Sequence, residues 1–312
     1  MRVLVTGGAG FIGSHLVDAL LARGDAVTVF DNLSNGSMDN LKNHTTNPGF
    51  RFIQGDIRDA KAIKNAVAGV DAVIHGAAMI SVPLSIEDPE LAHSVNVGGT
   101  LMLLKASLGS GIKRFVYASS SAIYGEQTQL PISEEAPSKP LSPYASSKLA
   151  AEQNCRTFYE LEGLETVCLR YFNIYGPRQT GEYAGVMTKF MERLRANQPP
   201  VIYDDGDQTR DFIYVDDVVD ATLLALERDG AAGETLNVGT GRAISINELC
   251  GIFLRLAGKT GLKPTHEAPR SGDIRHSQAD IAKMRKFLDY EPKVSLEDGV
   301  KKLLRTLGVT ER

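Results

Sequence analysis

The sequence predicts an α/β fold, with a doubly wound parallel sheet and a smaller C-terminal α+β lobe. In the first half, short β-branched and apolar runs alternate with longer amphipathic segments. Nearly continuous apolar strands between helices are typical of a parallel sheet covered on both faces. After Tyr171 the pattern becomes irregular, and Gly, Pro and Arg cluster between shorter segments. The expected strands are residues 2–6, 26–31, 51–55, 72–75, 114–118 and 166–171.

The helices carry recognisable start and stop signals. The first should run from Phe11 to Arg23, because Gly24 suits the position after a helix C-terminus. Another begins near Tyr144, with Ser142 as N-cap and Pro143 as its first residue. Later helices are expected near residues 184–196, 216–228, 245–256 and 295–307. We therefore predict one domain over residues 1–173, to which 211–240 return, and a second lobe over 174–312.

Composition excludes several classes of function. The 312 residues are 43% hydrophobic and 23% charged, which is ordinary for a globular protein. The net charge of −4 and the lack of a basic run argue against nucleic acid as a partner. No apolar run reaches the ~20 residues of a membrane span, and no signal peptide is recognisable. Cys155, Cys168 and Cys250 form no CxxC pair, so we expect no disulfide or metal site, a buried Cys168 thiol and a cytoplasmic location.

A glycine-rich loop connects the first strand to the first helix. Gly7, Gly10 and Gly13 have the spacing GxxGxxG. Gly7 allows a tight turn, Gly10 lets the backbone approach a pyrophosphate, and Gly13 lets the helix pack close to the sheet. The free N–H groups at the helix start would bind the pyrophosphate. A strand before the loop and a helix after it are the context that a dinucleotide site requires.

Two carboxylates follow the next strands. Asp31 ends the second strand, where an acid accepts hydrogen bonds from the adenosine ribose and repels a 2′-phosphate. It favours NAD over NADP, although a turn residue before Asn32 is an alternative. Asp56 follows the third strand and could bond the adenine amino group or cap the helix that starts near Ala60.

A phenol and an ammonium lie four residues apart at Tyr144 and Lys148, on one helix face. The positive charge is expected to lower the pKa of Tyr144 from about 10 toward neutrality, as a base that takes a hydroxyl proton requires. Ser119, Ser120 and Ser121 end the fifth strand and place hydroxyls at the sheet edge where this fold binds ligands.

In this order and at these separations, the motifs resemble the extended short-chain dehydrogenase/reductase family, whose cofactor domain is a Rossmann fold. The resemblance covers the whole chain. Residues 170–179, 206–212, 236–239 and 270–273 are similar to nucleotide-sugar epimerases and dehydratases in particular. The resemblance implies NAD as cofactor, a UDP-sugar as substrate and a homodimer.

The resemblance also implies roles for individual residues. Ser120 would be the catalytic hydroxyl with Ser121 beside it, Tyr144 the base, and Lys148 the residue that holds the nicotinamide ribose. Asn173 would bind the sugar diphosphate, and Arg210 and Arg270 would clamp its phosphates, to which their planar guanidinium groups are suited. Further cofactor contacts are expected at Phe11, Ile12, Asn32, Asp56, Ile57 and Ala77, and further substrate contacts at Gln179, Asp273 and Ser277.

The residues after Ser120 restrict the reaction. Dehydratases of this group resemble one another in an Asp-Glu pair there, and UDP-glucuronate decarboxylases in a Glu at the second position. This chain has Ser121 and Ala122. The resemblance therefore implies a 4-epimerase, in which C4 is oxidised to a keto group, the sugar turns about its link to UDP, and hydride returns to the opposite face.

Ser277 bears on which hexose is used. Members restricted to glucose and galactose resemble one another in a tyrosine there, and a serine leaves room for an N-acetyl group. Gln179 is also similar to UDP-N-acetylhexosamine 4-epimerases, whereas Ile80 stands where members specific for N-acetyl sugars have glycine. We therefore expect activity on UDP-Glc/UDP-Gal and on UDP-GlcNAc/UDP-GalNAc.

Two alternatives stay open. A UDP-glucuronate 4-epimerase would need Arg178 or Thr180 near the sugar carboxylate. A non-catalytic NAD-sensing regulator shares the fold but typically lacks the tyrosine or the lysine. For the homodimer, the helices after Glu87 and from Tyr144 would pack on their mates. An apolar face of Leu101, Leu104 and Leu108 allows this, but burial on the sheet gives the same pattern.

Overall fold

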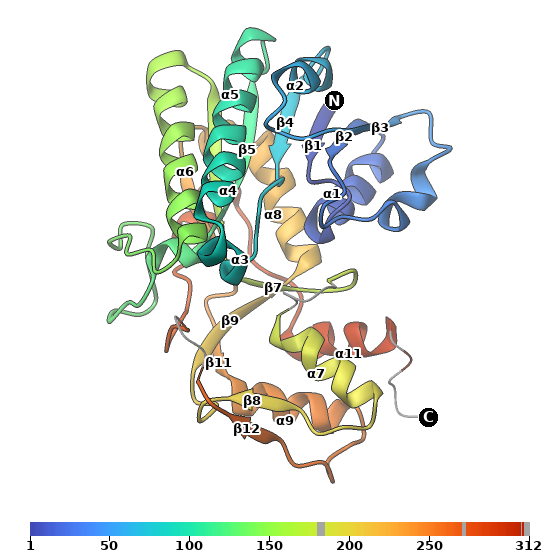
Figure 1. Ribbon diagram of the computed structural model, residues 1–312, viewed down its shortest axis with the longest axis vertical. Helices are drawn as coiled ribbons and strands as arrows, with labels where there is room; N and C mark the ends of the chain where they lie inside the picture. The colour runs from blue at the N-terminus through green and yellow to red at the C-terminus, as the bar shows by residue number, and fades with distance from the viewer. Residues whose placement is uncertain (180–184, 270–272, 307, 309–312) are drawn as a thin grey trace.

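A seven-stranded, entirely parallel sheet forms the larger part of the chain in the computed structural model (Figure 1), which describes residues 1–179, 185–269, 273–306 and 308. The order is β10-β6-β5-β4-β1-β2-β3, so the direction of winding reverses between β1 and β4, as in a doubly wound fold. The strands are β1 (Arg2–Thr6), β2 (Ala26–Asp31), β3 (Phe50–Gln54), β4 (Ala72–His75), β5 (Arg114–Ser120), β6 (Glu165–Tyr171) and β10 (Thr235–Val238).

Helices cover both faces of this sheet, as predicted. On one face lie α1 (Phe11–Ala22) and α8 (Val215–Glu227), which contact each other. On the other face lie α2 (Ala60–Ala66), α5 (Thr100–Gly109) and α6 (Pro143–Glu162). Each face has its own apolar core, with Leu16 and Val218 in one and Leu104 and Ala151 in the other. Leu104 is thus buried on the sheet, whereas Leu108 is 37% exposed.

The predicted helix boundaries of this part are confirmed to within a residue or two. Gly24 follows the first helix with φ +87°, a conformation that glycine adopts without strain. The Ser142 hydroxyl accepts the Ala145 N–H, and Pro143 opens α6. Between α5 and α6, a short 3₁₀ turn at Ser121–Tyr124 follows β5. The remaining elements of this part are the 3₁₀ segments Met38–His44 and Asp229–Ala231, α3 (Val82–Glu87), α4 (Pro89–His93), a π-helical turn at Ser94–Gly99, and α10 (Ala282–Leu288).

The smaller lobe, at the bottom of Figure 1, has a core of its own. One sheet has the order β11-β9-β7, with β7 (Asn173–Tyr175), β9 (Thr209–Tyr214) and β11 (Ala243–Ser245). A second pairs β8 (Val201–Tyr203) with β12 (Thr265–Glu267). The helices of this lobe are α7 (Val186–Arg195), α9 (Ile246–Leu256) and α11 (Leu296–Thr306).

The segment expected to return to the large sheet does so only in part. Helix α8 packs on the large sheet and β10 pairs with β6. Residues 211–214, however, belong to β9 and pair with β7 and β11 in the small lobe. The return therefore begins at Val215, because the ladder of β9 occupies the preceding residues.

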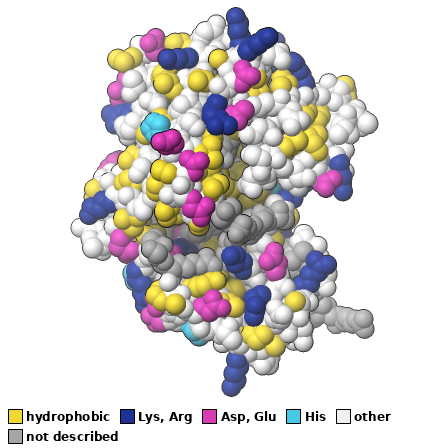
Figure 2. All heavy atoms as spheres, viewed as in Figure 1, with side chains coloured by type: hydrophobic (Ala, Val, Ile, Leu, Met, Phe, Trp, Pro, Cys, Tyr) yellow, Lys and Arg dark blue, Asp and Glu magenta, His cyan; other side chains and the backbone are white. Residues whose placement is uncertain are grey.

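Surface and thiol properties follow the composition. Lys and Arg side chains are interspersed with Asp and Glu on the face that Figure 2 shows. Cys168 is buried, as expected, and a hydrogen bond with Cys155, together with burial, raises the pKa of its thiol. Among the described helices, none is long and apolar enough to cross a membrane. The described residues also contain no group of three or more His, Cys, Asp or Glu side chains that could hold a metal ion.

Candidate active site

The predicted cofactor and catalytic residues meet at the carboxyl ends of the parallel strands. Thr6 ends β1, Asp31 ends β2, His75 ends β4 and Ser120 ends β5. The register places Thr6 beside His75 and Ser120 beside Tyr171. The edge lies where the strand order reverses, which is where open α/β sheets bind their ligands.

The glycine loop forms a close-packed turn at the start of α1. Gly7 has φ +71°, and a Cβ on it would lie 2.7 Å from the Ala77 nitrogen. A Cβ on Gly13 would collide with the Gly7 carbonyl oxygen. The N-cap of α1 is Gly10, which has no side chain to bond the N–H groups of the first turn, including those of Phe11 and Ile12. This cradle therefore fits a pyrophosphate, and NAD would be held there.

Asp31 is buried beside the loop and holds it in place. Its carboxylate accepts the Ala9 N–H at 3.0 Å and the Leu33 N–H at 2.8 Å. A carboxylate has about four acceptor positions, so two are left for the hydroxyls of a ribose. The geometry thus accommodates both interpretations of Asp31, a turn residue and a ribose acceptor.

Asp56 does not cap the next helix. The N-cap of α2 is Asp59, whose carboxylate accepts the N–H groups of Lys61 and Ala62. Asp56 instead pairs with Arg58 at 2.7 Å, and this hydrogen bond lowers the pKa of Asp56 to about 2. Asn32 donates to the same carboxylate at 3.4 Å. The capping interpretation was therefore wrong, while an adenine contact stays a prediction.

The catalytic pair lies on α6 against the end of β5. Tyr144 lies beside Ser120, whose hydroxyl acts to lower the pKa of the Tyr144 phenol. The Ser120 oxygen accepts the Ala122 N–H at 3.2 Å, which leaves the hydroxyl proton of Ser120 for Tyr144. Lys148 is buried and its Nζ donates to the Ala118 carbonyl at 2.6 Å. The structure thus brings Ser120, Tyr144 and Lys148 together as the sequence predicted.

The expected lowering of the Tyr144 pKa is not found. Burial raises the pKa of Tyr144 above its usual value, and the hydrogen bond with Ser120 only opposes this rise. Burial also lowers the pKa of Lys148 to about 8. Lys148 does not lower the Tyr144 pKa because its ammonium is directed elsewhere. It donates to the Ala118 carbonyl and lies over the Tyr117 ring, 4.8 Å from the ring centroid.

A buried ion pair behind this site was not predicted. Glu152, one turn after Lys148, bonds the Arg170 guanidinium at 2.6 and 3.1 Å and accepts the Ser119 hydroxyl at 2.7 Å. Arg170 also donates to the Tyr124 hydroxyl at 2.8 Å. In the sequence, Glu152 and Arg170 would each be expected at the surface. Only their proximity in the fold shows that they form a buried pair.

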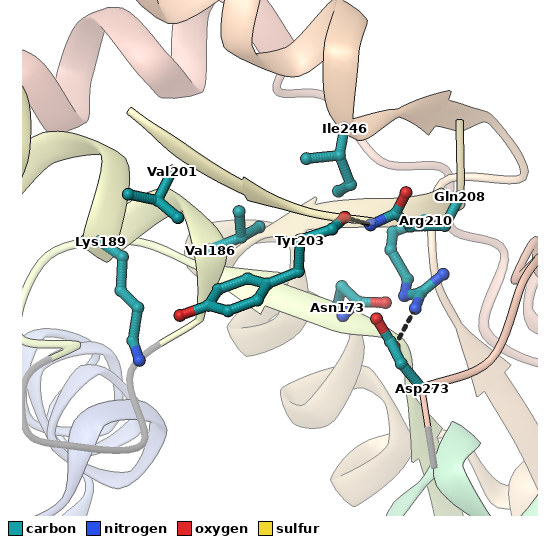
Figure 3. A pocket seen from close by; sticks show the side chains of 9 residues that line it. All are labelled: Asn173, Val186, Lys189, Val201, Tyr203, Gln208, Arg210, Ile246 and Asp273. Carbon is teal, nitrogen blue, oxygen red and sulfur yellow. Dashed lines mark hydrogen bonds and ion pairs between the residues drawn. The ribbon is translucent and has the colours of Figure 1, made fainter. Parts of the chain in front are cut away.

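A cavity of about 200 Å³ opens in the small lobe (Figure 3). Arg210, Asp273 and Asn173 lie on one side of it, and Arg210 forms an ion pair with Asp273. Lys189 lies at the opposite side, with Tyr203 between. Three of the nine lining residues were predicted. The nine are Asn173, Val186, Lys189, Val201, Tyr203, Gln208, Arg210, Ile246 and Asp273. Gln208 lies within the motif 206–212, but no motif marks the other five, which come from α7, β8 and the start of α9.

Ser120, Ser121 and Tyr144 lie outside that lining, and so do two predicted substrate residues of the small lobe, Gln179 and Ser277. Gln179 donates to the Ile174 carbonyl at 3.2 Å and accepts the Thr188 hydroxyl at 3.2 Å. Ser277 is buried, and its N–H donates to the Thr209 carbonyl at 3.1 Å. Arg270 and Thr180 lie outside the described residues.

Comparisons with known proteins agree with this architecture. The family model described as the NAD dependent epimerase/dehydratase family matches residues 3–239. A putative UDP-glucose 4-epimerase of Methanocaldococcus jannaschii is 41% identical over 99% of both chains. The solved UDP-glucose 4-epimerase of Thermotoga maritima with UDP-glucose is 40% identical, with a TM-score of 0.92 over 98% of both chains. The UDP-N-acetylglucosamine 4-epimerase of Methanobrevibacter ruminantium in complex with UDP-N-acetylmuramic acid is 38% identical, with a TM-score of 0.92 over 97% of both chains.

Proposed function

Because the chain belongs to the NAD-dependent epimerase/dehydratase family, of the extended short-chain dehydrogenase/reductase type, we propose that it inverts C4 of a UDP-hexose. The observation that carries this proposal is the placement of Tyr144 beside Ser120. Ser120 ends β5, and Tyr144 lies one turn before Lys148 on α6. Ser121 and Ala122 follow Ser120 and supply no acid for dehydration. Oxidation at C4 and its reversal are the chemistry left to such a site.

The chain's own residues then have distinct tasks. The chemistry that bound NAD supplies is reversible acceptance of a hydride from C4. Tyr144 takes the proton of the 4-hydroxyl, and Ser120 hydrogen-bonds the same oxygen. Lys148 presents its ammonium to the nicotinamide ribose and, since its pKa is about 8, carries a positive charge at neutral pH. A cation there favours the phenolate of Tyr144 once substrate and cofactor exclude water.

The two lobes divide the binding. Residues 1–173, together with the returning segment, would hold NAD, and the lobe of residues 174–312 would hold the UDP part of the substrate, with the sugar toward Ser120 and Tyr144. The cavity supports this because Asn173 and Arg210 would reach the phosphates while aliphatic walls receive the base. On substrate binding, the Arg210 guanidinium would leave its ion pair with Asp273 and bind a phosphate instead. Tight binding of the diphosphate would let the keto sugar rotate within the site without dissociating.

For the hexose, we propose activity on UDP-Glc/UDP-Gal and on UDP-GlcNAc/UDP-GalNAc. The relatives support both, since one is named a UDP-glucose and another a UDP-N-acetylglucosamine 4-epimerase. Of the two residues that the glucuronate alternative would use, the Arg178 guanidinium is already paired with Asp18 on α1 at 2.7 Å, and Thr180 lies outside the described residues. The regulator alternative is disfavoured because Tyr144 and Lys148 are both in place.

A homodimer is part of the proposal. Ile86 on α3 and Leu161 on α6 are 62% and 76% exposed, and Met102 and Leu108 on α5 are exposed as well. Packing of these helices on a second copy would cover them. Light scattering coupled to gel filtration should give the mass of two chains, and the mass of one chain at micromolar concentration would contradict the dimer.

The decisive experiment is turnover of the purified protein on the four UDP-sugars without added NAD, followed by chromatography. We expect interconversion within both pairs and none of UDP-glucuronate. Ser277→Tyr should selectively abolish the N-acetyl pair, whereas the control Ser277→Ala, which keeps the space, should retain both. Equal loss of both pairs in Ser277→Tyr would refute the placement of Ser277, and turnover of UDP-glucuronate alone would refute the substrate.

A further inference from the structure

A buried histidine at the end of β4 has no role in the site so far. His75 is 1% exposed and lies between the Phe115 and Tyr117 rings, with centroids 5.8 and 5.7 Å away. Its two ring nitrogens face two hydroxyls. Nδ1 is 2.7 Å from the Thr6 Oγ, and Nε2 is 2.9 Å from the Thr100 Oγ. Such a histidine is either inert packing or part of a directed network.

The hydrogen-bond directions follow from the partners. The Thr100 hydroxyl donates to the Asn96 carbonyl at 2.6 Å, so it can only accept from His75. Nε2 therefore carries the proton. The Ala77 N–H donates to the Thr6 oxygen at 3.2 Å, and the Thr6 hydroxyl donates to Nδ1. Burial lowers the pKa of His75 to about 3, which keeps the ring neutral and this single tautomer in place.

The far end of this chain of bonds reaches the catalytic helix. The Asn96 side chain accepts the Met79 N–H at 2.8 Å and donates to the Met79 carbonyl at 3.0 Å. It also donates to the Ser147 hydroxyl at 2.9 Å, and Ser147 donates to the Tyr144 carbonyl at 2.8 Å. Asn96 therefore joins the loop after β4 to the turn of α6 that carries Tyr144.

The π-helical turn Ser94–Gly99 fits this network. In a regular α-helix, the Asn96 carbonyl would accept the Thr100 N–H. In a π-helical turn the bonds run to the N–H five residues on, and here the Asn96 carbonyl also accepts the Thr100 hydroxyl at 2.6 Å. π-helical turns occur mostly as single interruptions and often lie at functional sites.

We propose that His75 is a positioning residue, held neutral with its proton on Nε2, which sets the position of Tyr144 relative to the glycine loop. Toward the loop it acts through Thr6 and Ala77, whose nitrogen would lie only 2.7 Å from a Cβ on Gly7. Toward Tyr144 it acts through Thr100 and Asn96. The expected effect on kcat rests on the proposed function, whereas the hydrogen-bond network around His75 does not depend on it.

The test is Thr100→Val, which removes the hydroxyl and keeps the shape, beside Thr100→Ser, which restores the hydroxyl. We expect Thr100→Val to lower kcat at least tenfold with KM and UDP affinity within twofold, because a small misplacement of reacting groups slows chemistry more than binding. Thr100→Ser should recover kcat to within threefold. Thr222→Val is the matched control, since Thr222 is buried, bonds the carbonyl four residues earlier in the same way and lies on α8.

Three results would overturn the proposal: an unchanged kcat in Thr100→Val, a Thr100→Ser variant as slow as Thr100→Val, or an equal loss in Thr222→Val. A readout independent of turnover is the ¹⁵N spectrum of histidine, which should show a His75 protonated at Nε2 only. Protonation at Nδ1 would contradict the network. If the parent turned over no UDP-sugar, the proposed function would fail while this spectrum still decided the geometry.

Discussion

The ion pair of Glu152 and Arg170 lies almost entirely out of water. Their exposed fractions are 2% and 6%, and the guanidinium bonds both carboxylate oxygens. Ser119, which precedes Ser120, shares the carboxylate. The pair therefore connects the strand that carries Ser120, the helix that carries Lys148, and β6.

We predict that Glu152→Gln destabilises the protein strongly. The change keeps the shape but leaves the Arg170 charge buried with only neutral partners, the Tyr124 hydroxyl and the Glu134 carbonyl. Removal of one partner of a buried pair costs about 3–5 kcal/mol, because the remaining charge is desolvated without compensation. Urea unfolding followed by circular dichroism at pH 7.5 measures this free energy.

The double variant Glu152→Met/Arg170→Met separates charge from shape. Hydrophobic replacement of a whole buried pair is often close to neutral, so the double variant should lose less stability than Glu152→Gln alone. Arg170→Met alone is the second single variant of the cycle. The reasoning would be refuted if Glu152→Gln cost less than about 1 kcal/mol, or if the double variant cost the sum of the single ones.

Three further predictions concern the cofactor loop, the cavity and His75. Gly13→Ala should abolish NAD retention, measured on the purified protein, because its Cβ would collide with the Gly7 carbonyl; NAD content equal to the parent's would contradict the loop as the cofactor site. Lys189→Met should weaken UDP binding about tenfold, measured by calorimetry, because Lys189 lines the cavity. The control Arg195→Met, on the exposed side of α7, should leave UDP binding unchanged. Equal weakening in both variants would show that the loss comes from the change in net charge and not from the cavity. The folded-state pKa of His75, about 3, lies below the unfolded value of 6.5, so the unfolded chain binds the extra proton and stability falls as pH decreases below 6.5. Gln at this position should therefore reduce the stability lost between pH 7 and pH 5 by about 2 kcal/mol in urea unfolding, and an unchanged loss would refute a neutral buried ring.

Local signals made the large domain predictable. The spacing of Gly7, Gly10 and Gly13 after a strand, and Pro143 behind a Ser142 cap, each depend on neighbours in the sequence. Such features survive folding because the hydrogen bonds that define them are local. Six of the seven strands of the large sheet followed from apolar runs, and their boundaries differed from the structure by two residues at most, whereas β10 was not predicted as a strand.

What escaped prediction depends on contacts distant in sequence. The Tyr144 pKa was expected to fall, but the direction of the Lys148 ammonium is set by the Ala118 carbonyl, thirty residues earlier. Lys189 on α7 and Tyr203 on β8 line the same cavity only because the fold brings these two elements together. The π-helical turn was not predicted either, because a threonine that bonds the carbonyl four residues earlier, as Thr100 does, also occurs in a regular helix at Thr222.

The account depends most directly on Tyr144 as the group that takes the sugar proton. Tyr144→Phe keeps the ring and removes the hydroxyl that bonds Ser120. We predict that the purified variant retains NAD and binds UDP as the parent does but interconverts UDP-hexoses about 10³-fold more slowly. Interconversion at the parent's rate would contradict the account.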